Sequence, residues 1–340
     1  MIKVVKNISL KNLNTFGVDV KSKYFVEIYS EEELKQALNS GEYSNHQKLI
    51  LGGGSNILFT KDYDGLVIKN SIPGIKLLDE DSKKVIVEAG AGVIWDELVK
   101  YCVDYNFGGI ENLSYIPGTV GAAPIQNIGA YGQELEEIFY ELNGIYIDSC
   151  ETKNFNKSEC SFSYRSSIFK NELKNKFIIT SVKLKLNKNP NVNLSYNSVK
   201  KEVEKKNIKQ PTIKDIREIV IAIRKSKLPD PVEIGNAGSF FKNPVITKEK
   251  FKVLKEEYPD LKHFFVDENN VKIFAAWLIE KCGWKGKRFG DTGTHKLQPL
   301  VIVNYGNASG KEIYEISKMI KSDVKTIFYI TLKNEVNIIN

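Results

Sequence analysis

The sequence predicts an α+β or mixed α/β protein that folds in several lobes. Short apolar strand patterns alternate with helical patterns in the first and last thirds of the chain. The chain has 340 residues, more than the roughly 100–200 that one domain usually holds. Leu228-Pro-Asp-Pro231 ends a long amphipathic helix pattern and marks a boundary between lobes.

Regular elements are predicted along most of the chain. Ser30 fits the N-cap of an early helix, because its hydroxyl can accept a backbone N–H bond from the first turn. Residues 108–132 are rich in glycine and predict little regular structure. The predicted elements are strands 23–28, 48–51, 57–60, 85–88, 177–186 and 300–304, helices 31–38, 95–105, 199–205, 213–225, 273–281 and 311–328, and an extended tail.

Composition indicates an ordinary globular protein. Hydrophobic residues make up 42% of the chain and charged residues 27%. The start of the chain has no signal-peptide pattern, and no window approaches the ~20 apolar residues of a membrane span. The four cysteines form no C-x-x-C pair and the three histidines no H-x-x-H spacing. We therefore expect a cytoplasmic protein with idle thiols, no metal site and no membrane segment.

The charge balance favours an anionic partner. Lys and Arg outnumber Asp and Glu by 49 to 42, a formal charge of +7. Nucleic acid, acidic lipid and phosphorylated metabolites would all suit this excess. A nucleic-acid-binding protein, however, predicts aromatic residues interleaved with a basic stripe, which this sequence lacks. We therefore expect a mildly basic enzyme with small-molecule substrates and no nucleic-acid partner.

Two short glycine motifs follow predicted strands. The run GGGSN at residues 52–56 joins two strands, and its backbone could form a nest for phosphate oxygens or a simple hairpin turn. The run GAGVIW at residues 90–95 lies between a strand and a helix. Trp95 replaces the third glycine of the dinucleotide fingerprint, and no βαβ unit surrounds the motif. A Rossmann fold is therefore excluded.

The most unusual stretch is the uncharged run IPGTVGAAPIQNIGAYG at residues 116–132. Four glycines and two prolines fix its path, and a loop of this length without charge is seldom a solvated connector. It could wrap an extended cofactor, with its amides and the side chains of Thr119, Gln126 and Asn127 binding phosphates or a planar ring. The alternative is a buried structural loop.

Together, GGGSN and IPGTVGAAPIQNIGAYGQE resemble the FAD-binding signature of the UDP-N-acetylenolpyruvoylglucosamine reductases, a family of vanillyl-alcohol-oxidase-like flavoproteins. Leu194-Ser-Tyr196 resembles the substrate loop of the longer, type I subgroup. Further matches extend over nearly the whole chain: Asn14-Thr-Phe-Gly-Val18, Ser163-Tyr-Arg-Ser-Ser-Ile-Phe169, Leu228-Pro-Asp-Pro231, Gly235-Asn-Ala-Gly-Ser-Phe-Phe-Lys-Asn-Pro244, Ala275-Ala-Trp-Leu-Ile279 and Glu335.

The resemblance implies a three-lobed fold that binds FAD without a covalent bond. Residues 1–70 and 71–226 would form two FAD-binding subdomains, 227–328 a substrate domain, and the tail 329–340 would rejoin the first lobe. We expect NADPH as the electron donor and a monomeric protein. The implied FAD-binding residues are Gly52, Gly53, Gly54, Ser55, Asn56, Ile116, Pro117, Gly118, Thr119, Gly121, Ala122, Gln126, Asn127, Gly129, Ala130, Tyr131 and Gly132.

The implied reaction is the reduction of the enolpyruvyl ether of UDP-N-acetylglucosamine, a step in peptidoglycan precursor synthesis. Hydride delivered from flavin N5 leaves negative charge beside the substrate carboxylate, which requires a fixed cation and a proton donor. By resemblance, Arg165 holds the carboxylate, Ser239 donates the proton, and Glu335 orients or neutralises the enolate region. Taken singly, these residues are typical of a surface ion pair, a turn hydroxyl and a solvated tail.

The UDP half of the substrate agrees with the basic charge balance. The resemblance places five residues around the diphosphate and uracil: Tyr196, Lys227, Asn243, Lys272 and Gln298. It also implies that NADPH uses the site that the sugar nucleotide later occupies, so a separate Rossmann domain is unnecessary.

The main rival function is that of a sugar or alcohol oxidase from the same flavin superfamily. Such enzymes use O2, and many carry flavin attached to a histidine. Only His46 is available in the first lobe, and it lies outside the glycine motifs. His295 has a metal or acid–base interpretation, but we expect a structural histidine there.

Overall fold

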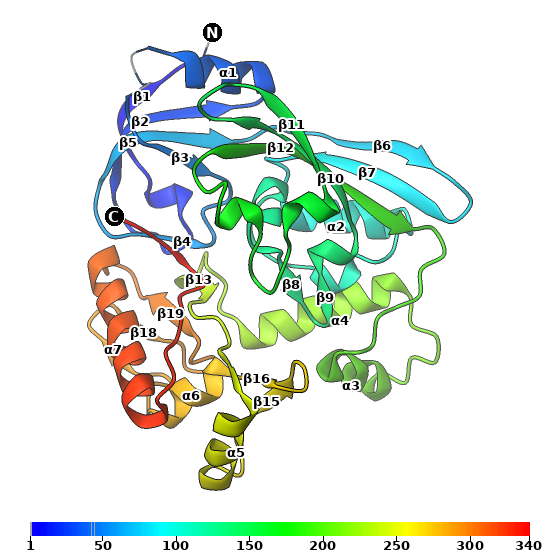
Figure 1. Ribbon diagram of the computed structural model, residues 1–340, viewed down its shortest axis with the longest axis vertical. Helices are drawn as coiled ribbons and strands as arrows, with labels where there is room; N and C mark the ends of the chain where they lie inside the picture. Colours follow the sequence, from blue (N-terminus) through cyan, green and yellow to red (C-terminus); the bar gives the residue numbers. More distant parts are fainter. Residues whose placement is uncertain (1, 42, 44) are drawn as a thin grey trace. The chain divides into compact units, whose positions relative to one another are not determined.

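The computed structural model describes residues 2–41, 43 and 45–340, which form two compact units (Figure 1). The first unit comprises Met1–Ile8, Lys21–Gly54 and Asp64–Ser226, and the second comprises Ser9–Val20, Ser55–Tyr63 and Lys227–Asn340. Both units contain helices and strands, which confirms the predicted α+β class. The finer division into three lobes stays a prediction. Within the described residues, no helix has the length and apolar character needed to cross a membrane.

Two sheets form the framework of the first unit. The first sheet has the order β1 (Val5–Ser9), β2 (Lys21–Ile28), β5 (Tyr63–Asn70), β3 (Lys48–Leu51). The second has the order β11 (Thr152–Asn156), β10 (Phe139–Tyr146), β12 (Phe177–Asn187), β7 (Lys84–Gly90), β6 (Ile75–Glu80), with every pair antiparallel. Burial alternates along β7, as expected for a strand with one face in the core.

Four helices accompany these sheets: α1 (Glu31–Asn39), α2 (Trp95–Asp104), α3 (Asn197–Lys205) and α4 (Ile213–Lys227). The Ser30 hydroxyl accepts the N–H of Glu33 at 3.2 Å, which confirms the predicted N-cap of α1. The apolar face of α2 shares one core cluster with β7 and β12. Val120 and Ile128 belong to that cluster, so the same core that holds α2 also supports the glycine-rich segment.

The glycine-rich segment is built from short turns, as predicted. Its regular parts are the 3-10 turns η2 (Glu111–Leu113), η3 (Val120–Ala122) and η4 (Pro124–Gln126) and the two-residue strands β8 (Gly129–Ala130) and β9 (Gln133–Glu134). Three more turns follow in this unit: η5 (Leu135–Glu137), η6 (Lys157–Cys160) and η7 (Ile168–Lys170).

The second unit combines three small sheets with three helices. The first sheet is β13 (Gly235–Ser239), β19 (Val301–Asn304), β18 (Thr292–Thr294), β17 (Arg288–Phe289); the second is β14 (Val245–Thr247), β16 (Asn270–Ile273), β15 (His263–Phe265); the third pairs β20 (Asn337–Ile339) with β4 (Ile57–Phe59) in parallel. Its helices are α5 (Lys248–Glu257), α6 (Ala275–Lys281) and α7 (Gly310–Phe328), and η1 (Lys11–Leu13) is a 3-10 turn.

The predicted helix 273–281 begins two residues later than expected. Ile273 still belongs to β16, and the helix starts at Ala275, whose N–H donates to Asn243 Oδ1 at 2.9 Å. The side chain of another chain segment therefore marks the helix start. A helical pattern alone cannot reveal such a partner.

The run at residues 14–18, one of the matches to the reductase family, has a structural role in the second unit. Asn14 is buried, and its amide donates to the carbonyls of Leu10 and Val18 while accepting the N–H of Val18. Phe16 O accepts a bond from Asn304 Nδ2 at 2.8 Å. This turn therefore connects an early chain segment to β19.

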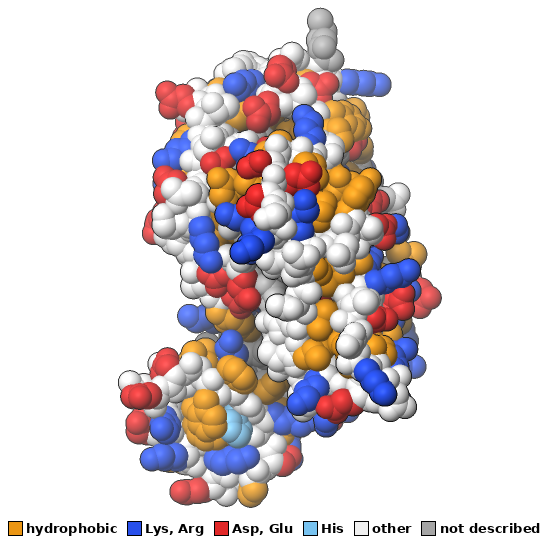
Figure 2. Space-filling view, turned by 90° about the vertical axis from the view of Figure 1, so that its right-hand side faces the viewer, with side chains coloured by type: hydrophobic (Ala, Val, Ile, Leu, Met, Phe, Trp, Pro, Cys, Tyr) orange, Lys and Arg blue, Asp and Glu red, His pale blue; other side chains and the backbone are white. Residues whose placement is uncertain are grey.

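Charged side chains are mixed on the molecular surface. Figure 2 shows basic and acidic groups interspersed over the face that it presents. Basic side chains are not gathered in one stripe among the described residues of that face.

Candidate active site

The two glycine segments predicted to bind the cofactor lie against each other in the first unit. A Cβ on Gly53 would lie 2.9 Å from Gly118 Cα, and a Cβ on Gly52 would lie 2.5 Å from Thr119 Oγ1. Only glycine fits at either position without moving its neighbour. Lys69 Nζ donates to the Gly52 carbonyl at 2.5 Å, and burial lowers the pKa of this lysine. The result is a close-packed backbone cradle of the kind that suits an extended phosphate-bearing group.

The stretch before α2 supports one side of this cradle. Trp95 N–H donates to Gly118 O at 3.0 Å, Val120 N–H to Val93 O at 2.9 Å, and Gly121 N–H to Ala91 O at 2.9 Å. Because these bonds alternate between the two runs, they hold Gly118–Gly121 as a short antiparallel ladder.

The motif at residues 90–92 uses its glycines differently. A Cβ on Gly90 would lie 2.4 Å from Pro73 O, and a Cβ on Gly92 would lie 2.3 Å from Ser71 C. The N–H groups of both glycines donate to backbone carbonyls at 2.9 Å. These amides are therefore engaged within the protein, which agrees with the exclusion of a dinucleotide fingerprint.

The second half of the glycine-rich segment is fixed by its own side chains. Asn127 is 0% exposed; its Nδ2 donates to Glu134 Oε2 at 2.9 Å and its Oδ1 accepts the N–H of Glu136 at 3.0 Å. Gln126 is half-buried and accepts a bond from Lys170 Nζ at 3.4 Å. The Asn127 side chain thus has protein partners, and its contact with a cofactor stays a prediction. Contact with a cofactor likewise stays a prediction for the remaining residues: Gly54, Ser55, Asn56, Ile116, Pro117, Gly121, Ala122, Gly129, Ala130, Tyr131 and Gly132.

Arg165 is anchored to the end of that segment. It lies in a tight turn closed by two bonds between the backbones of Ser163 and Ser166, and its φ is +54°. Its Nη2 donates to Gly129 O at 2.5 Å, and its guanidinium lies 5.3 Å from the ring centre of Tyr164. The predicted carboxylate-binding arginine is therefore held directly beside a predicted cofactor residue.

Ser239 and Glu335 lie on neighbouring chain segments of the second unit. Ser239 ends β13 opposite Val301, after a turn in which Gly238 has a φ of +67° and donates its N–H to Asn236 Oδ1. Glu335 N–H donates to Phe240 O at 2.8 Å. The extended tail therefore passes the residue next to Ser239, although Glu335 and Ser239 are 96 positions apart in sequence.

Asn56 is attached to the same tail. Its Nδ2 donates to Glu335 O at 3.3 Å, and its carbonyl accepts the N–H of Asn337 at 3.1 Å. The end of the GGGSN run and the predicted catalytic glutamate are thus neighbours within the second unit.

The predicted UDP-binding residues fall into separate parts of the structure. Asn243 lies two residues before β14, and Lys272 lies on the neighbouring strand β16: Pro244 O accepts the N–H of Ile273, and Val245 pairs with Lys272. Gln298 O accepts the N–H of Val301, the residue opposite Ser239. Lys227 is exposed at the end of α4.

Tyr196 precedes α3 in the first unit and is exposed. Its ring meets the ring of Tyr131 edge to face, with 5.3 Å between centres.

Comparison with known proteins agrees with this geometry. Residues 22–142 match the family described as FAD binding domain, and residues 230–339 match the C-terminal domain of UDP-N-acetylenolpyruvoylglucosamine reductase. The reductase of Flavobacterium johnsoniae is 52% identical over 99% of this chain and 100% of that protein. The reductase of Amoebophilus asiaticus is 48% identical over 98% of each chain. The chain belongs to the UDP-N-acetylenolpyruvoylglucosamine reductase family.

A solved structure confirms the fold that the sequence predicted for this family. The UDP-N-acetylenolpyruvylglucosamine reductase of Thermus caldophilus superimposes with a TM-score of 0.68 over 100% of this chain and 99% of that chain, at 24% identity. Together with the FAD binding domain match, the fold is that of the vanillyl-alcohol-oxidase-like flavoproteins. The chain is accordingly an FAD-dependent oxidoreductase of the reductase family.

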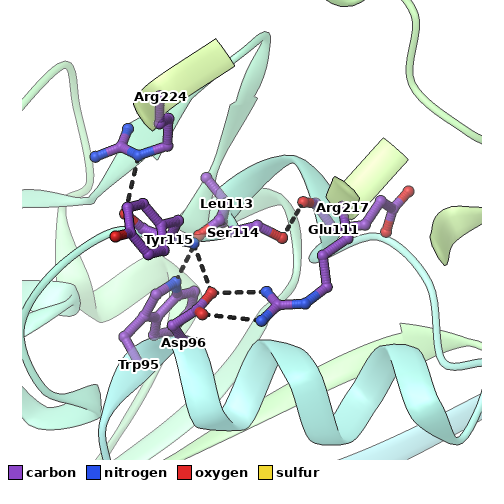
Figure 3. A network of polar contacts seen from close by, with 8 residues as sticks. All are labelled: Trp95, Asp96, Glu111, Leu113, Ser114, Tyr115, Arg217 and Arg224. Carbon is purple, nitrogen blue, oxygen red and sulfur yellow. Dashed lines mark hydrogen bonds and ion pairs between the residues drawn. The ribbon is translucent and has the colours of Figure 1, made fainter. Parts of the chain in front are cut away.

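The sequence did not reveal a charged network around Tyr115, just before the uncharged run at residues 116–132 (Figure 3). Arg217 binds both carboxylate oxygens of Asp96, at 2.6 and 2.8 Å. Asp96 Oδ1 accepts the N–H of Tyr115 at 2.5 Å, and Arg224 Nε donates to Tyr115 O at 2.9 Å. In the sequence, Asp96 lies in one helix pattern and Arg217 and Arg224 lie in another. Nothing in either pattern indicates that these side chains meet, because only the fold brings them together.

Asn112 is a second residue of this reductase-family chain that the sequence did not single out. It is 1% exposed, and its Nδ2 donates to Tyr131 O at 2.9 Å and to Asn193 O at 3.1 Å. Asn193 Nδ2 in turn donates to Gly132 O at 3.0 Å. These bonds attach the base of the Tyr196 loop to the end of the glycine-rich segment.

The histidine and the cysteines considered in the sequence analysis include three buried residues: His295, Cys102 and Cys160. His295 is 7% exposed, and burial lowers the pKa of its imidazole. Burial also raises the pKa of the Cys102 and Cys160 thiols to about 12, so these groups stay protonated and unreactive near neutral pH. Across residues 2–41, 43 and 45–340, no three His, Cys, Asp or Glu side chains are grouped to hold a metal ion.

Proposed function

We propose that this protein reduces the enolpyruvyl ether of UDP-N-acetylglucosamine to UDP-N-acetylmuramate in the cytoplasm, using bound FAD and NADPH. Family membership supports the reductase activity. The observation that carries the cofactor assignment is the contact of Gly52 and Gly53 with Gly118 and Thr119. It joins the two sequence segments that together resemble an FAD signature, in a geometry that excludes side chains larger than glycine.

The residues of the cradle fit a flavin dinucleotide. Close-packed glycine backbone lets N–H groups approach a diphosphate, and the engaged Lys69 adds positive charge beside Gly52. Bound FAD would take hydride from NADPH and deliver it from N5 to the terminal carbon of the substrate double bond. His46, the single histidine in the first unit's sequence, packs its ring against Tyr24 at 4.9 Å, which favours non-covalent binding.

Arg165 would hold the substrate carboxylate. A guanidinium stays charged throughout the reaction and can bind both carboxylate oxygens. The bond from Nη2 to Gly129 O orients this side chain before substrate arrives, and preorganised charge stabilises a developing anion most effectively. Arg165 would therefore both bind the substrate and stabilise the negative charge that hydride addition leaves beside the carboxylate.

Ser239 would donate the proton that completes the reduction. The new C–H bond forms at the carbon next to the carboxylate as the Ser239 O–H bond breaks, and solvent later restores the hydroxyl proton. A serine hydroxyl is a weak acid at rest, but the enolate is a strong base, so transfer becomes favourable once the enolate exists. Asn236 supports this position, because it fixes the Gly238 turn that precedes Ser239.

Glu335 would orient the reacting end of the substrate or compensate its charge. Its backbone N–H donates to the carbonyl of Phe240, the residue after Ser239, which supports a shared role. The diphosphate and uracil would be bound by the five residues predicted from the resemblance: Tyr196, Lys227, Asn243, Lys272 and Gln298.

Anaerobic stopped-flow absorbance tests this function. The purified protein is mixed first with NADPH and then with the enolpyruvyl sugar nucleotide. We expect NADPH to bleach the oxidised-flavin band and the sugar nucleotide to restore it. Ser239→Ala should keep the bleaching step and slow the recovery by about 10²–10⁴-fold, the usual contribution of general acid catalysis.

Ser149→Ala is the matched control, since Ser149 is an exposed turn residue of the first unit. It should leave both steps unchanged. Recovery of the flavin band with O2 alone would favour the oxidase interpretation. A protein that carries and binds no flavin would contradict the proposed function altogether.

A further inference from the structure

Tyr115 adopts a backbone conformation that its residue type disfavours. Its φ is +58°, in the left-handed region where a side chain with a Cβ is crowded by the backbone. The next residue, Ile116, starts the segment that would bind FAD. A tyrosine stays in this region only when its surroundings hold it there.

Charged groups from two helices hold both backbone polar groups of Tyr115. Asp96 of α2 accepts its N–H at 2.5 Å, and Arg224 of α4 donates to its carbonyl at 2.9 Å (Figure 3). Arg217 of α4 fixes Asp96 through two bonds. Hydrogen bonds to ionised groups are shorter and stronger than neutral ones, so this set can maintain an unfavourable φ.

The residue beside Asp96 anchors the same turn at two further points. Trp95 Nε1 donates to Leu113 O at 2.9 Å, and its backbone N–H donates to Gly118 O at 3.0 Å. The first two residues of α2 thus contact the turn 113–118 at its start, middle and end. Gly118 in turn lies against Gly53.

We propose that Asp96, fixed by Arg217, is a positioning residue for the cofactor: it sets the Tyr115 backbone and thereby directs Ile116–Gly118 toward Gly53. This inference rests on the proposed binding of FAD by that segment. Burial works to raise the pKa of the Asp96 carboxyl, but the bonds from Arg217 and the Tyr115 N–H outweigh it and lower the pKa. The carboxylate therefore stays ionised and able to accept both bonds at neutral pH.

The alternative is an ordinary ion pair that joins α2 to α4. Such a pair would affect the thermal stability of the flavin-free protein, but it would have no specific link to the conformation of Tyr115. The two roles are separated by Tyr115→Asn, because asparagine adopts the left-handed region more readily than tyrosine. Asparagine at this position would restore the turn without restoring the ion pair.

The experiment titrates the flavin-free full-length chain with FAD, follows flavin fluorescence, and records the thermal midpoint of the same flavin-free samples. Asp96→Asn should raise the FAD Kd about tenfold or more, as loss of charge-assisted bonds implies. Adding Tyr115→Asn to that variant should recover most of the affinity while leaving the thermal midpoint where Asp96→Asn set it. Asp104→Asn is the matched control, because Asp104 is on the same helix and pairs with Lys100 at the surface.

The FAD affinities of these variants test whether Asp96 positions the cofactor segment. Equal FAD affinity for Asp96→Asn and Asp104→Asn would overturn it, as would a loss of affinity that Tyr115→Asn does not recover. If Asp96→Asn fails to fold, Arg217→Lys replaces it, since lysine cannot make both bonds to the carboxylate. An unaltered chain that binds no FAD would instead refute the proposed function.

Discussion

The glycines at residues 52–54 and those at residues 90 and 92 look alike in sequence but have different structural roles. Gly52 and Gly53 contact another glycine-rich segment, and the Gly52 carbonyl accepts a bond from a lysine. Gly90 and Gly92 instead pack against the backbone of residues 71–73, with their N–H groups bonded to carbonyls. The first motif is suited to a ligand, and the second builds the scaffold that supports the ligand-binding segment.

In both motifs glycine allows another chain segment to approach the backbone closely. The identity of that segment decides whether the glycine serves a ligand site or the scaffold. In the scaffold motif, Gly90 and Gly92, the partner is residues 71–73, the connection between β5 and β6. In the other motif the partner is Gly118, which itself belongs to an uncharged, partly accessible segment. Substitution of each glycine should therefore affect different properties.

The largest effect is expected for Gly92→Ala. The new methyl group would lie 2.3 Å from the backbone of Ser71, which has no flexible end that can move away. We expect the free energy of unfolding to fall by about 3 kcal/mol or more. Urea unfolding of the flavin-free protein measures this change. Gly41→Ala is the control, because the described atoms leave open space around its Cβ position; a stable Gly92→Ala protein would contradict the scaffold role.

Gly53→Ala should affect the cofactor more than the fold. Its methyl group would press on Gly118 Cα at 2.9 Å and separate the two segments. We expect FAD affinity to fall about tenfold to a hundredfold, the equivalent of about 1–3 kcal/mol of overpacking. Fluorescence titration with FAD measures the affinity, and urea unfolding of the flavin-free form measures stability. If stability falls as far as in Gly92→Ala while affinity is kept, the two motifs do not differ in the way described.

Acid should weaken the support that the Asp96 carboxylate gives to the turn at Tyr115. Because Asp96 has a lowered pKa, its contribution is fully present above the unfolded value of ~3.9 and is lost as pH falls through the folded value. The stability difference between the unaltered protein and Asp96→Asn, about 1–2 kcal/mol at pH 7, should therefore shrink below about pH 4. Urea unfolding at several pH values tests this, and a difference that grows on acidification would be inconsistent with an ionised Asp96.

The smallest effect is expected at Lys69, which fixes the carbonyl of Gly52. Lys69→Met keeps much of the side-chain length but removes the donor. We expect FAD affinity to fall about threefold to tenfold, the equivalent of one hydrogen bond of about 1 kcal/mol. The same fluorescence titration measures it, with Lys76→Met on the exposed strand β6 as the control. Equal affinities for both variants would remove Lys69 from the cradle.

The sequence predicted local elements well because their causes are local. The Ser30 cap, the strand before GGGSN and the amphipathic helix α4 each depend on residues a few positions apart. In the two large sheets, strands β1, β5, β6, β10 and β11 were not predicted. The side chains of β6 are mostly exposed and give no alternating pattern. The resemblance to the reductase family gave candidate roles for Arg165 and Ser239, but not their supporting contacts.

Those supporting contacts could not be predicted because they join distant parts of the chain. Asn112 is an ordinary loop residue in sequence, and only the fold shows that it is buried between Tyr131 and Asn193. The left-handed backbone of Tyr115 likewise has no sequence signal, since tyrosine is not a residue that favours it. Buried polar groups with remote partners are the feature that pattern reading misses.

The pairing of β4 with β20 has a consequence for how the chain is made. Thr60, the residue after β4, donates its hydroxyl hydrogen to Ile339 O across 279 residues. A ribosome adding roughly 5–20 residues per second would need on the order of 15–60 s to supply that partner. During this interval β4 would remain an unpaired edge, a form open to wrong pairing or to chaperones. The end of the GGGSN run would thus acquire its final neighbours late, and a nascent chain could not assemble this part of the site ahead of its tail.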